Sequence, residues 1–359
     1  MKKILYIIGI CLVALSCERR ELTYDYSPYC EVLVNVDWSN MSEAPTGMSI
    51  RAYPEDGGEP IVVQSNTITS GTLKLPAGVY NILVFNQIPS DFGTVGFRGL
   101  DKWETAEVYS VEDATKSWAT TKADETIVRE PEDIAVATYE DVEICEDCIQ
   151  KSTEQYELTG ERIVAETLNL KPRIVVKRTF VRVKVDGISN LRSTRGVLTG
   201  MSDGYNFSTQ QSFSSQVSHV LENWTIEDFE YGDQFGETNI YFMSFGLPET
   251  TTTTRVADDW QGSIYLQILL VDNKTIIEHT ADISQNTTTN DDEETRDADV
   301  ETDVDVDVET NITVEVGLSG SLDDPPPVLP NVKPEGSSSS GFDATVEDWG
   351  DEESYDLPV

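Results

Sequence analysis

The segment Leu75–Asn86, LPAGVYNILVFN, constrains the fold of this chain more than any other stretch. A Pro-Ala-Gly turn precedes seven residues that are almost all β-branched, aromatic or aliphatic. A run this short, bounded by turn residues, indicates a strand that is buried on both faces rather than a helix. Alternate side chains would then face opposite sides of a sheet: Tyr80, Ile82 and Val84 on one side, Leu83 and Phe85 on the other. Such a strand is typical of the middle of a β-sandwich.

The neighbouring segments predict a first sandwich over residues 24–168. Cys30–Trp38 alternates apolar and polar residues, as a half-buried strand does. A hairpin is expected around Asp56-Gly57-Gly58. Residues 101–118 are expected to be helical or irregular, and residues 123–147 to form loops with one or two strands. The boundary to the next domain is placed at Leu168–Pro172.

A second sandwich is predicted over residues 169–318, because the period of two restarts at Phe180–Ile188. Val181, Val183 and Val185 would point inward, and Arg182 and Lys184 outward. Residues 197–209 and 239–248 follow as strands, and residues 263–283 as a hairpin that turns at Asp272-Asn273. Since no long amphipathic helix separates these strands, the sequence favours an all-β fold of two tandem sandwiches.

An acidic ladder lies near the end of the second sandwich, in VETDVDVDVETNITVEV. Apolar and acidic residues alternate here, and spaced carboxylates are ligands that Ca²⁺ prefers. An EF-hand loop, however, needs Gly at its sixth position, and counting from Asp303 this position is Val308. We therefore favour a solvated strand face over a calcium site, and predict no metal site.

The C-terminal region reads as a Pro-rich and then Ser-rich linker, residues 319–341, followed by a terminal strand and acidic tail, residues 342–359. The strand Phe342–Trp349 could add to an open sheet edge of a partner, or fold back as the last strand of its own domain, which is the more common arrangement. If Leu75–Asn86 is central, association must use an edge. The exchangeable candidates are then Phe342–Trp349 and an outer first strand at Cys30–Trp38.

The N-terminus predicts export and a lipid anchor. Residues 1–16 carry two lysines and then an apolar stretch too short to span a bilayer, as in a secretion signal. Cys17 follows the small Ser16, an arrangement that resembles the lipobox of bacterial lipoproteins. Cys17 would then be the lipidation site, carrying acyl chains such as palmitate, and residues 17–23 the tether to outer-membrane lipid. The alternative is an ordinary signal peptide that is cleaved near a cysteine.

Composition excludes some partners. The chain has 65 acidic and 25 basic residues, a formal net charge of -40. Nucleic acid and anionic lipid surfaces would be repelled, so no nucleic-acid partner is expected.

Three cysteines remain once Cys11 leaves with the signal and Cys17 is lipidated: Cys30, Cys145 and Cys148. Cys145 and Cys148 have the C-x-x-C spacing of redox and zinc sites. Zinc needs further soft ligands, which the two isolated histidines do not supply. Thioredoxin-like redox chemistry needs the pair at a helix N-terminus within a β-α-β unit, and the two intervening acids should raise the thiol pKa. A structural disulfide is preferred, with Cys30 as one candidate partner, and its pairing stays open.

Motifs of enzymes are absent. The sequence has no G-x-S-x-G, no P-loop and no dinucleotide-binding glycine pattern, and the carboxylates are too numerous for one pair to stand out. We predict a protein that is not an enzyme, with no catalytic residues and no cofactor.

Four features together resemble a family of Bacteroidota lipoproteins similar in plan to the FimB-like anchor and accessory proteins of type V fimbriae. They are the start at Cys17, the strand LPAGVYNILVFN, the strand VRVKVDGI followed by LTGMSDGY, and Gly-Phe-x-x-x-Val-x-x-Trp after the Pro-rich linker. The resemblance implies two tandem transthyretin-like (Greek-key) β-sandwich domains. It also implies attachment to the outer membrane and a role as fimbrial anchor, accessory subunit or surface adhesin that pairs strands with fimbrial subunits. Because Glu18-Arg19-Arg20 follows the cysteine, the membrane face stays open, periplasmic or external.

The alternative function is a cell-envelope lipoprotein that binds glycan or another ligand. Clustered exposed aromatic residues would favour it, and Trp103, Trp118 and Trp260 are the candidates. Packing in a core explains each tryptophan equally well.

Overall fold

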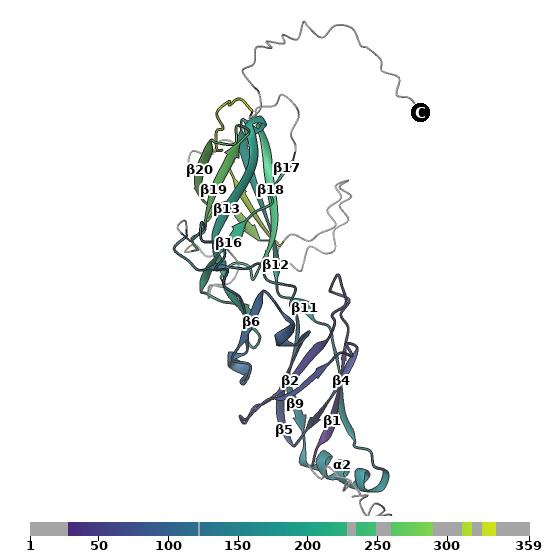
Figure 1. The fold of residues 1–359 in the computed structure, drawn as a ribbon. Helices are drawn as coiled ribbons and strands as arrows, with labels where there is room; N and C mark the ends of the chain where they lie inside the picture. Colours follow the sequence, from purple (N-terminus) through teal and green to yellow (C-terminus); the bar gives the residue numbers. More distant parts are fainter. Residues whose placement is uncertain are drawn as a thin grey trace, which may run out of the picture.

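The computed structural model describes residues 28–120, 123–227, 235–248, 260–289, 311–317 and 325–334. These residues form two lobes arranged end to end, with a smaller layer of strands between them (Figure 1). Strands dominate both lobes, and a single α-helix, α2 (Glu146–Thr159), occurs within the described ranges. The predicted all-β, β-sandwich fold class is confirmed.

The first lobe is a sandwich of two sheets. Its strands are β1 (Cys30–Val36), β2 (Met48–Pro54), β3 (Ile61–Ser65), β4 (Ser70–Leu75), β5 (Gly78–Asn86), β9 (Ala135–Ile144), β10 (Val164–Leu170) and β11 (Arg173–Ile174). One sheet has the order β10-β1-β4 and the other the order β11-β9-β5-β2-β3. The apolar core between the sheets includes side chains from most of these strands.

Strand β5 contains most of the apolar segment Leu75–Asn86. It lies between β9 and β2, and seven consecutive residues from Tyr80 to Asn86 are buried. Tyr80, Ile82 and Val84 belong to the core of the sandwich. Leu83 and Phe85 belong to a separate apolar cluster on the outer face of the same sheet. The prediction of burial on both faces is confirmed, because each face of β5 meets a different core.

Strand β1 has the predicted buried face but not the predicted position. Cys30, Val32, Val34 and Val36 are buried, as the alternation indicated. The strand pairs in parallel with β10 on one side and antiparallel with β4 on the other. The prediction of an outer, exchangeable first strand at Cys30–Trp38 is therefore wrong. Alternation shows which face of a strand is buried, and carries no information about its two edges.

The second lobe is also a sandwich. Its strands are β12 (Lys177–Asp186), β13 (Leu191–Ser202), β16 (Gln216–Leu221), β17 (Thr225–Glu227), β18 (Phe235–Ser244), β19 (Ser263–Leu270), β20 (Ile276–Asp282), β21 (Thr287–Thr289) and β22 (Ile312–Val316), joined by β8 (Ile127–Val128). The sheet orders are β17-β18-β12-β22-β21 and β20-β19-β13-β16-β8.

Two predicted elements of this lobe are confirmed. Val181, Val183 and Val185 of β12 are fully buried in the core, whereas Arg182 and Lys184 both reach the carboxylate of Glu237 on the neighbouring strand β18. The β19–β20 hairpin turns through Asn273, which adopts a positive φ of 57°.

A third layer joins the lobes. It consists of β6 (Val95–Arg98), β7 (Glu107–Ser110), β14 (Gly204–Asn206) and β15 (Gln211–Ser212), in the order β15-β14-β7-β6. The first half of the chain thus supplies β6 and β7, and the second half supplies β14 and β15. Similarly, β8 of the first half pairs in parallel with β16 of the second. The division at residue 168 stays a prediction, and both sides of it contribute strands to this shared layer.

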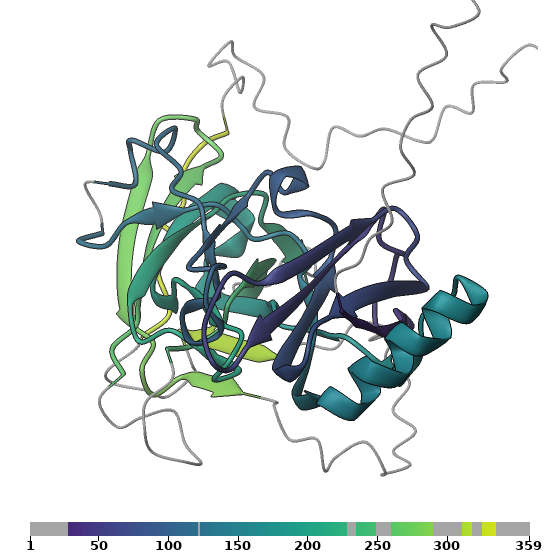
Figure 2. The ribbon, with the colours of Figure 1, turned by 90° about the horizontal axis from the view of Figure 1, so that it is seen from below.

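Helix α2 was not expected from the sequence. It lies beside the strands of the first lobe (Figure 2), buries Ile149 and Ser152, and ends at Gly160 with φ of 78°. The hydroxyl of Ser152 donates a hydrogen bond of 2.8 Å to the carbonyl of Tyr29, just before β1. Short 3-10 helices occur at η1 (Pro89–Asp91), η2 (Trp103–Thr105) and η3 (Ile188–Asn190).

The last described residues pack on the second lobe. In β22, Ile312, Val314 and Val316 are buried, which confirms the alternation at that end of the acidic ladder; residues 301–309 lie outside the described residues. Part of the expected linker, residues 325–334, lies against β12. The N–H of Asp186 donates to the carbonyl of Pro327 at 3.0 Å, and the N–H of Leu329 to the carbonyl of Asp186 at 2.8 Å. Leu329 is buried in the core.

Candidate functional site

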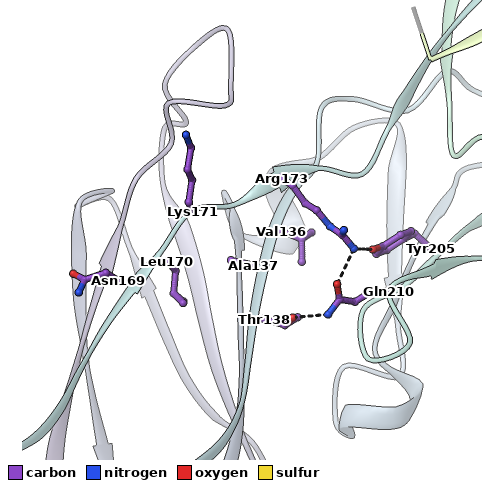
Figure 3. A pocket seen from close by; sticks show the side chains of 9 residues that line it. All are labelled: Val136, Ala137, Thr138, Asn169, Leu170, Lys171, Arg173, Tyr205 and Gln210. Atoms are coloured by element: carbon purple, nitrogen blue, oxygen red, sulfur yellow. Dashed lines mark hydrogen bonds between the residues drawn. The ribbon is translucent and has the colours of Figure 1, made fainter. Parts of the chain in front are cut away.

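A cavity of about 280 Å³ lies where the first lobe meets the third layer. Its walls come from β9, from the end of β10 through to the start of β11, and from the β14–β15 hairpin (Figure 3). It is lined by Val136, Ala137, Thr138, Asn169, Leu170, Lys171, Arg173, Tyr205 and Gln210.

The polar side of this cavity is a chain of hydrogen bonds centred on Arg173. The guanidinium donates to the hydroxyl of Tyr205 at 2.9 Å and to the side-chain oxygen of Gln210 at 2.7 Å. The amide of Gln210 then donates to the hydroxyl of Thr138 on β9 at 3.0 Å (Figure 3). The network ties β9 and β11 of the first lobe to the loop between β14 and β15. The two hydrogen bonds of the guanidinium hold the β14–β15 loop in place, and the cavity lining contains no carboxylate and no histidine.

A cluster of thiols lies at the opposite end of the first lobe. Cys145 is the N-cap residue of α2, with extended backbone angles, and its sulfur accepts a hydrogen bond from the N–H of Cys148 at 3.2 Å. The two sulfurs are 2.9 Å apart. Cys145, Cys148 and the buried Cys30 are all free thiols, so the structural disulfide preferred from the sequence is not formed.

Two expectations about these thiols were wrong. The C-x-x-C pair does lie at a helix N-terminus. The pKa of the Cys145 thiol is lowered, because hydrogen bonds from the side chain and backbone of Cys148 outweigh the opposing effects of burial and of the charge of Asp147. A helix was not predicted here, so the effect of its N–H groups on the pKa of the Cys145 thiol could not be expected from the sequence.

Open sheet edges are the surfaces on which another strand could pair. Among the strands of the described residues, the long edge strands are β10 in the first lobe and β20 in the second, each with seven residues. Each presents an exposed apolar side chain: Val164 is 49% exposed on β10 and Ile276 is 52% exposed on β20. Phe342–Trp349 lies outside the described residues.

The three tryptophans considered for ligand binding do not come together. Trp260 is buried in the core of the second lobe, and its indole N–H donates to the carbonyl of Gly200 at 2.8 Å. Trp103 packs beside Tyr53 at the junction, with ring centroids 5.7 Å apart. Trp118 packs on a small separate cluster, with the guanidinium of Arg195 above its ring. They are parts of three different cores, and no shared platform forms.

Among the described residues, no group of three or more His, Cys, Asp or Glu side chains is arranged to hold a metal ion. None of their helices is both long and apolar enough to cross a membrane. The predicted lipidation site, Cys17, lies outside the described part of the chain.

Two β-sandwich lobes, held end to end by a layer to which both halves contribute, define an all-β tandem-sandwich protein. The chain belongs to the family described as a domain of unknown function, DUF5119, whose sequence profile matches residues 16–222. The matched region contains the whole first lobe, the third layer, and the strands from β12 to β16.

Three known proteins are similar to this chain. A Bacteroides ovatus protein named "Putative fimbrium anchoring subunit Fim4B" is 24% identical over 99% of this chain and 97% of its own length. A crystal structure of "a putative adhesin" from Bacteroides ovatus aligns with a TM-score of 0.57 and 21% identity, over 89% of this chain and 98% of that one. The fimbrial anchor protein Mfa2 from Porphyromonas gingivalis aligns with a TM-score of 0.38 and 12% identity, over 66% of this chain and 77% of that one. The resemblance to fimbrial anchor and accessory proteins of Bacteroidota is confirmed.

Proposed function

We propose that this protein is a lipid-anchored subunit of the cell envelope that attaches a fimbrium, as an anchor or accessory subunit. The observation that carries the proposal is the similarity to Fim4B, which extends over 99% of this chain and 97% of that one. Similarity of this extent includes both lobes, the layer between them and both termini. A shared domain alone would match only part of either chain.

The protein acts by binding and is not an enzyme in this proposal. The relatives reported above are named for anchoring and adhesion. The cavity at the junction is lined by a hydrogen-bonded arginine network, which supports a positioning role for these residues.

Attachment to the outer membrane would come from acyl chains on Cys17. Residues 17–27 would connect the membrane to Pro28, next to the end of the first lobe where Tyr29 contacts α2. In this arrangement the first lobe is nearer the membrane and the second lobe presents its strands to a partner.

The anchor is tested with Cys17→Ala, using Cys11→Ala as the matched control. Cys17→Ala should shift the protein from the membrane fraction to the soluble fraction, because it removes the acylated residue. Cys11→Ala should leave partitioning unchanged, because Cys11 lies within the segment that is cleaved. Equal membrane partitioning of both variants would contradict the anchor.

A partner subunit would add a strand to an open edge, and β20 is the edge that the second lobe offers. An edge strand carries unpaired backbone N–H and C=O groups on which another strand can pair, and this supports a contact at β20. The N–H of Leu270 donates to the carbonyl of Thr275 across the hairpin. In an antiparallel ladder, alternate residues of a strand direct their N–H groups towards the paired strand. Thr275 is in a bonded pair with β19, and Thr280 lies an odd number of residues further along, so the N–H of Thr280 faces away from β19.

This edge is tested with Thr280→Pro and Thr280→Ala. Proline removes the outward donor while leaving the bonds to β19 in place, so Thr280→Pro should abolish co-purification with fimbrial subunits, whereas Thr280→Ala should retain it. A parallel deletion of Gly341–Val359 tests the tail as the connecting strand. If the subunits still co-purify with a folded Thr280→Pro protein, β20 is not the contact. If co-purification is lost only when Gly341–Val359 is deleted, the tail is the contact.

A further inference from the structure

The Cys145–Cys148 pair is built like a reactive dithiol. Strand β9 ends at Ile144, and α2 begins at Glu146, so Cys145 occupies the turn between a buried strand and a helix. The N–H of Ile149 donates to the carbonyl of Cys145 at 3.1 Å, and that of Cys148 to its sulfur at 3.2 Å. The first bond fixes the backbone of Cys145 at the start of the helix, and the second holds its sulfur at the helix N-terminus, 2.9 Å from the sulfur of Cys148.

The surroundings of the pair favour the thiolate of Cys145. Helix N-termini stabilise negative charge on a cysteine sulfur. The nearby acid that opposes this effect, Asp147, is held in a salt bridge of 2.5 Å to Lys151. The pKa of Cys145 is lowered by its hydrogen bonds with Cys148, whereas that of Cys148 is raised by the same contact. The two thiols therefore differ in reactivity, with Cys145 as the better nucleophile near neutral pH.

The third thiol of the cluster has the opposite character. Cys30 at the start of β1 is 0% exposed, while Cys145 and Cys148 are both half-buried. Burial raises the pKa of the Cys30 thiol. A buried thiol with a raised pKa is a slow nucleophile, so Cys30 serves as an internal control for the other two.

We propose that Cys145 and Cys148 form a redox-active pair that a protein or small-molecule disulfide oxidises to an intramolecular disulfide. The thiolate of Cys145 attacks one sulfur of the oxidant, which forms a mixed disulfide and releases the first thiol of the oxidant. Cys148 then loses its proton to solvent and attacks the sulfur of Cys145, which releases the second thiol. The pair loses two electrons and two protons in total, and the oxidant disulfide is reduced to two thiols.

The disulfide would join two residues of one turn and leave Cys30 reduced. Its formation would tie the end of β9 to the first turn of α2. The inference rests on the geometry of residues 144–151 and does not depend on the proposed fimbrial function.

The test uses the chain from residue 17 onward in a Cys17→Ala background, so that Cys30, Cys145 and Cys148 are the remaining thiols. The protein is equilibrated in glutathione buffers from fully reduced to fully oxidised, quenched with acid, denatured, and labelled with a maleimide polymer that shifts its mobility on a gel. We expect two thiols to be lost together in one two-electron transition, and peptide mapping to join Cys145 to Cys148. Retention of all three thiols in oxidised glutathione, or a crosslink that includes Cys30, would overturn the proposal.

Single variants test the order of attack. Cys148→Ser keeps the backbone donor to Cys145 and should accumulate a mixed disulfide with glutathione at Cys145. Cys145→Ser should form the corresponding adduct at Cys148 several-fold more slowly at pH 7. Cys30→Ser should leave the two-electron transition unchanged. Faster adduct formation at Cys148 would overturn the assignment of Cys145 as the attacking thiol.

Discussion

The ring of Phe207 lies nearly parallel to that of Phe85, with an interplanar angle of 6° and centroids 6.0 Å apart. Phe85 belongs to β5 in the centre of the first lobe, and Phe207 follows β14 in the second half of the chain. Both rings are fully buried. This stack is a direct apolar contact between the two halves, and it makes the third layer part of the first lobe's packing.

Phe207→Ala should therefore destabilise the protein strongly. Removing a fully buried phenylalanine side chain costs about 3–5 kcal/mol, because the lost burial is compounded by a cavity. Phe235→Ala is the matched control, since that phenylalanine is 59% exposed and its loss should cost well under about 1 kcal/mol. Urea denaturation followed by circular dichroism measures both values, and similar costs for the two variants would contradict the packing role of Phe207.

Gly187 should tolerate no side chain. Its φ is 81°, and an added Cβ would lie 2.5 Å from the backbone carbonyl oxygen of Leu329. Gly160, at the end of α2, has a similar φ of 78° but open space around it, so Gly160→Ala measures the backbone cost alone, about 1–2 kcal/mol. We expect Gly187→Ala to cost more and to expose residues 325–334 to limited proteolysis. Equal stability and equal protease resistance of the two variants would show that residues 325–334 move to accommodate a Cβ at position 187 without a loss of folding stability.

His219 should make the second lobe less stable in acid. The side chain is fully buried beside Phe242, and burial lowers its pKa from 6.5 to about 4. Below pH 6.5 the unfolded chain takes up a proton that the folded chain does not bind until about pH 4. Stability is thus fully present above pH 6.5 and falls across this window, by about 3 kcal/mol in total.

His219→Leu removes this term, because leucine does not titrate. Unfolding free energies of the two proteins, measured at several pH values between 7.5 and 4.5, should therefore diverge as the pH falls, with the parent losing more stability. Contributions from the carboxylates are common to both proteins and cancel in the difference. Parallel pH profiles would contradict the buried, neutral state of His219.

Arg173 should hold the junction through its two hydrogen bonds. Arg173→Met keeps the apolar stem of the side chain but removes the donors to Tyr205 and Gln210, so we expect a loss of about 1–2 kcal/mol. The exposed Arg192 provides the matched control, and Arg192→Met should change stability by less than about 0.5 kcal/mol. Urea denaturation of both variants measures the difference in folding stability. A loss for Arg192→Met as large as that for Arg173→Met would show that the effect comes from removing a positive charge and not from the two hydrogen bonds of Arg173.

Local pattern predicted the faces of the strands well and their neighbours poorly. The alternations of β1, β5 and β12 reported correctly which side chains are buried, because burial of one face imposes a period of two. The same pattern could not place β1 between β10 and β4, since pairing along an edge uses backbone groups that every residue carries. The third layer could not be predicted from the sequence either. In this layer Gly204 pairs with Tyr109, and pairing between residues so far apart in the sequence produces no local pattern in either short segment.

The candidate sites show the same limit. Helix α2 escaped prediction because only Ile149 and Ser152 are buried along its length, so it lacks a continuous apolar stripe. Without the helix, the sequence placed the C-x-x-C pair in an acidic loop and missed the N–H groups that lower the pKa of Cys145. Arg173, Tyr205 and Gln210 were not singled out at all, because the cavity arises only when the third layer closes on β9.

The position of β1 has a mechanical consequence. The strand runs from α2, where Tyr29 contacts Ser152, towards the junction, where the side chain of Asn40 donates to the carbonyl of Pro172. A pull on Pro28 against the second lobe therefore acts along the length of β1, and loads its bonds to β10 and β4 in shear. Under such a load the two ladders share the force and must yield together, whereas a force applied across the strand would break the bonds pair by pair.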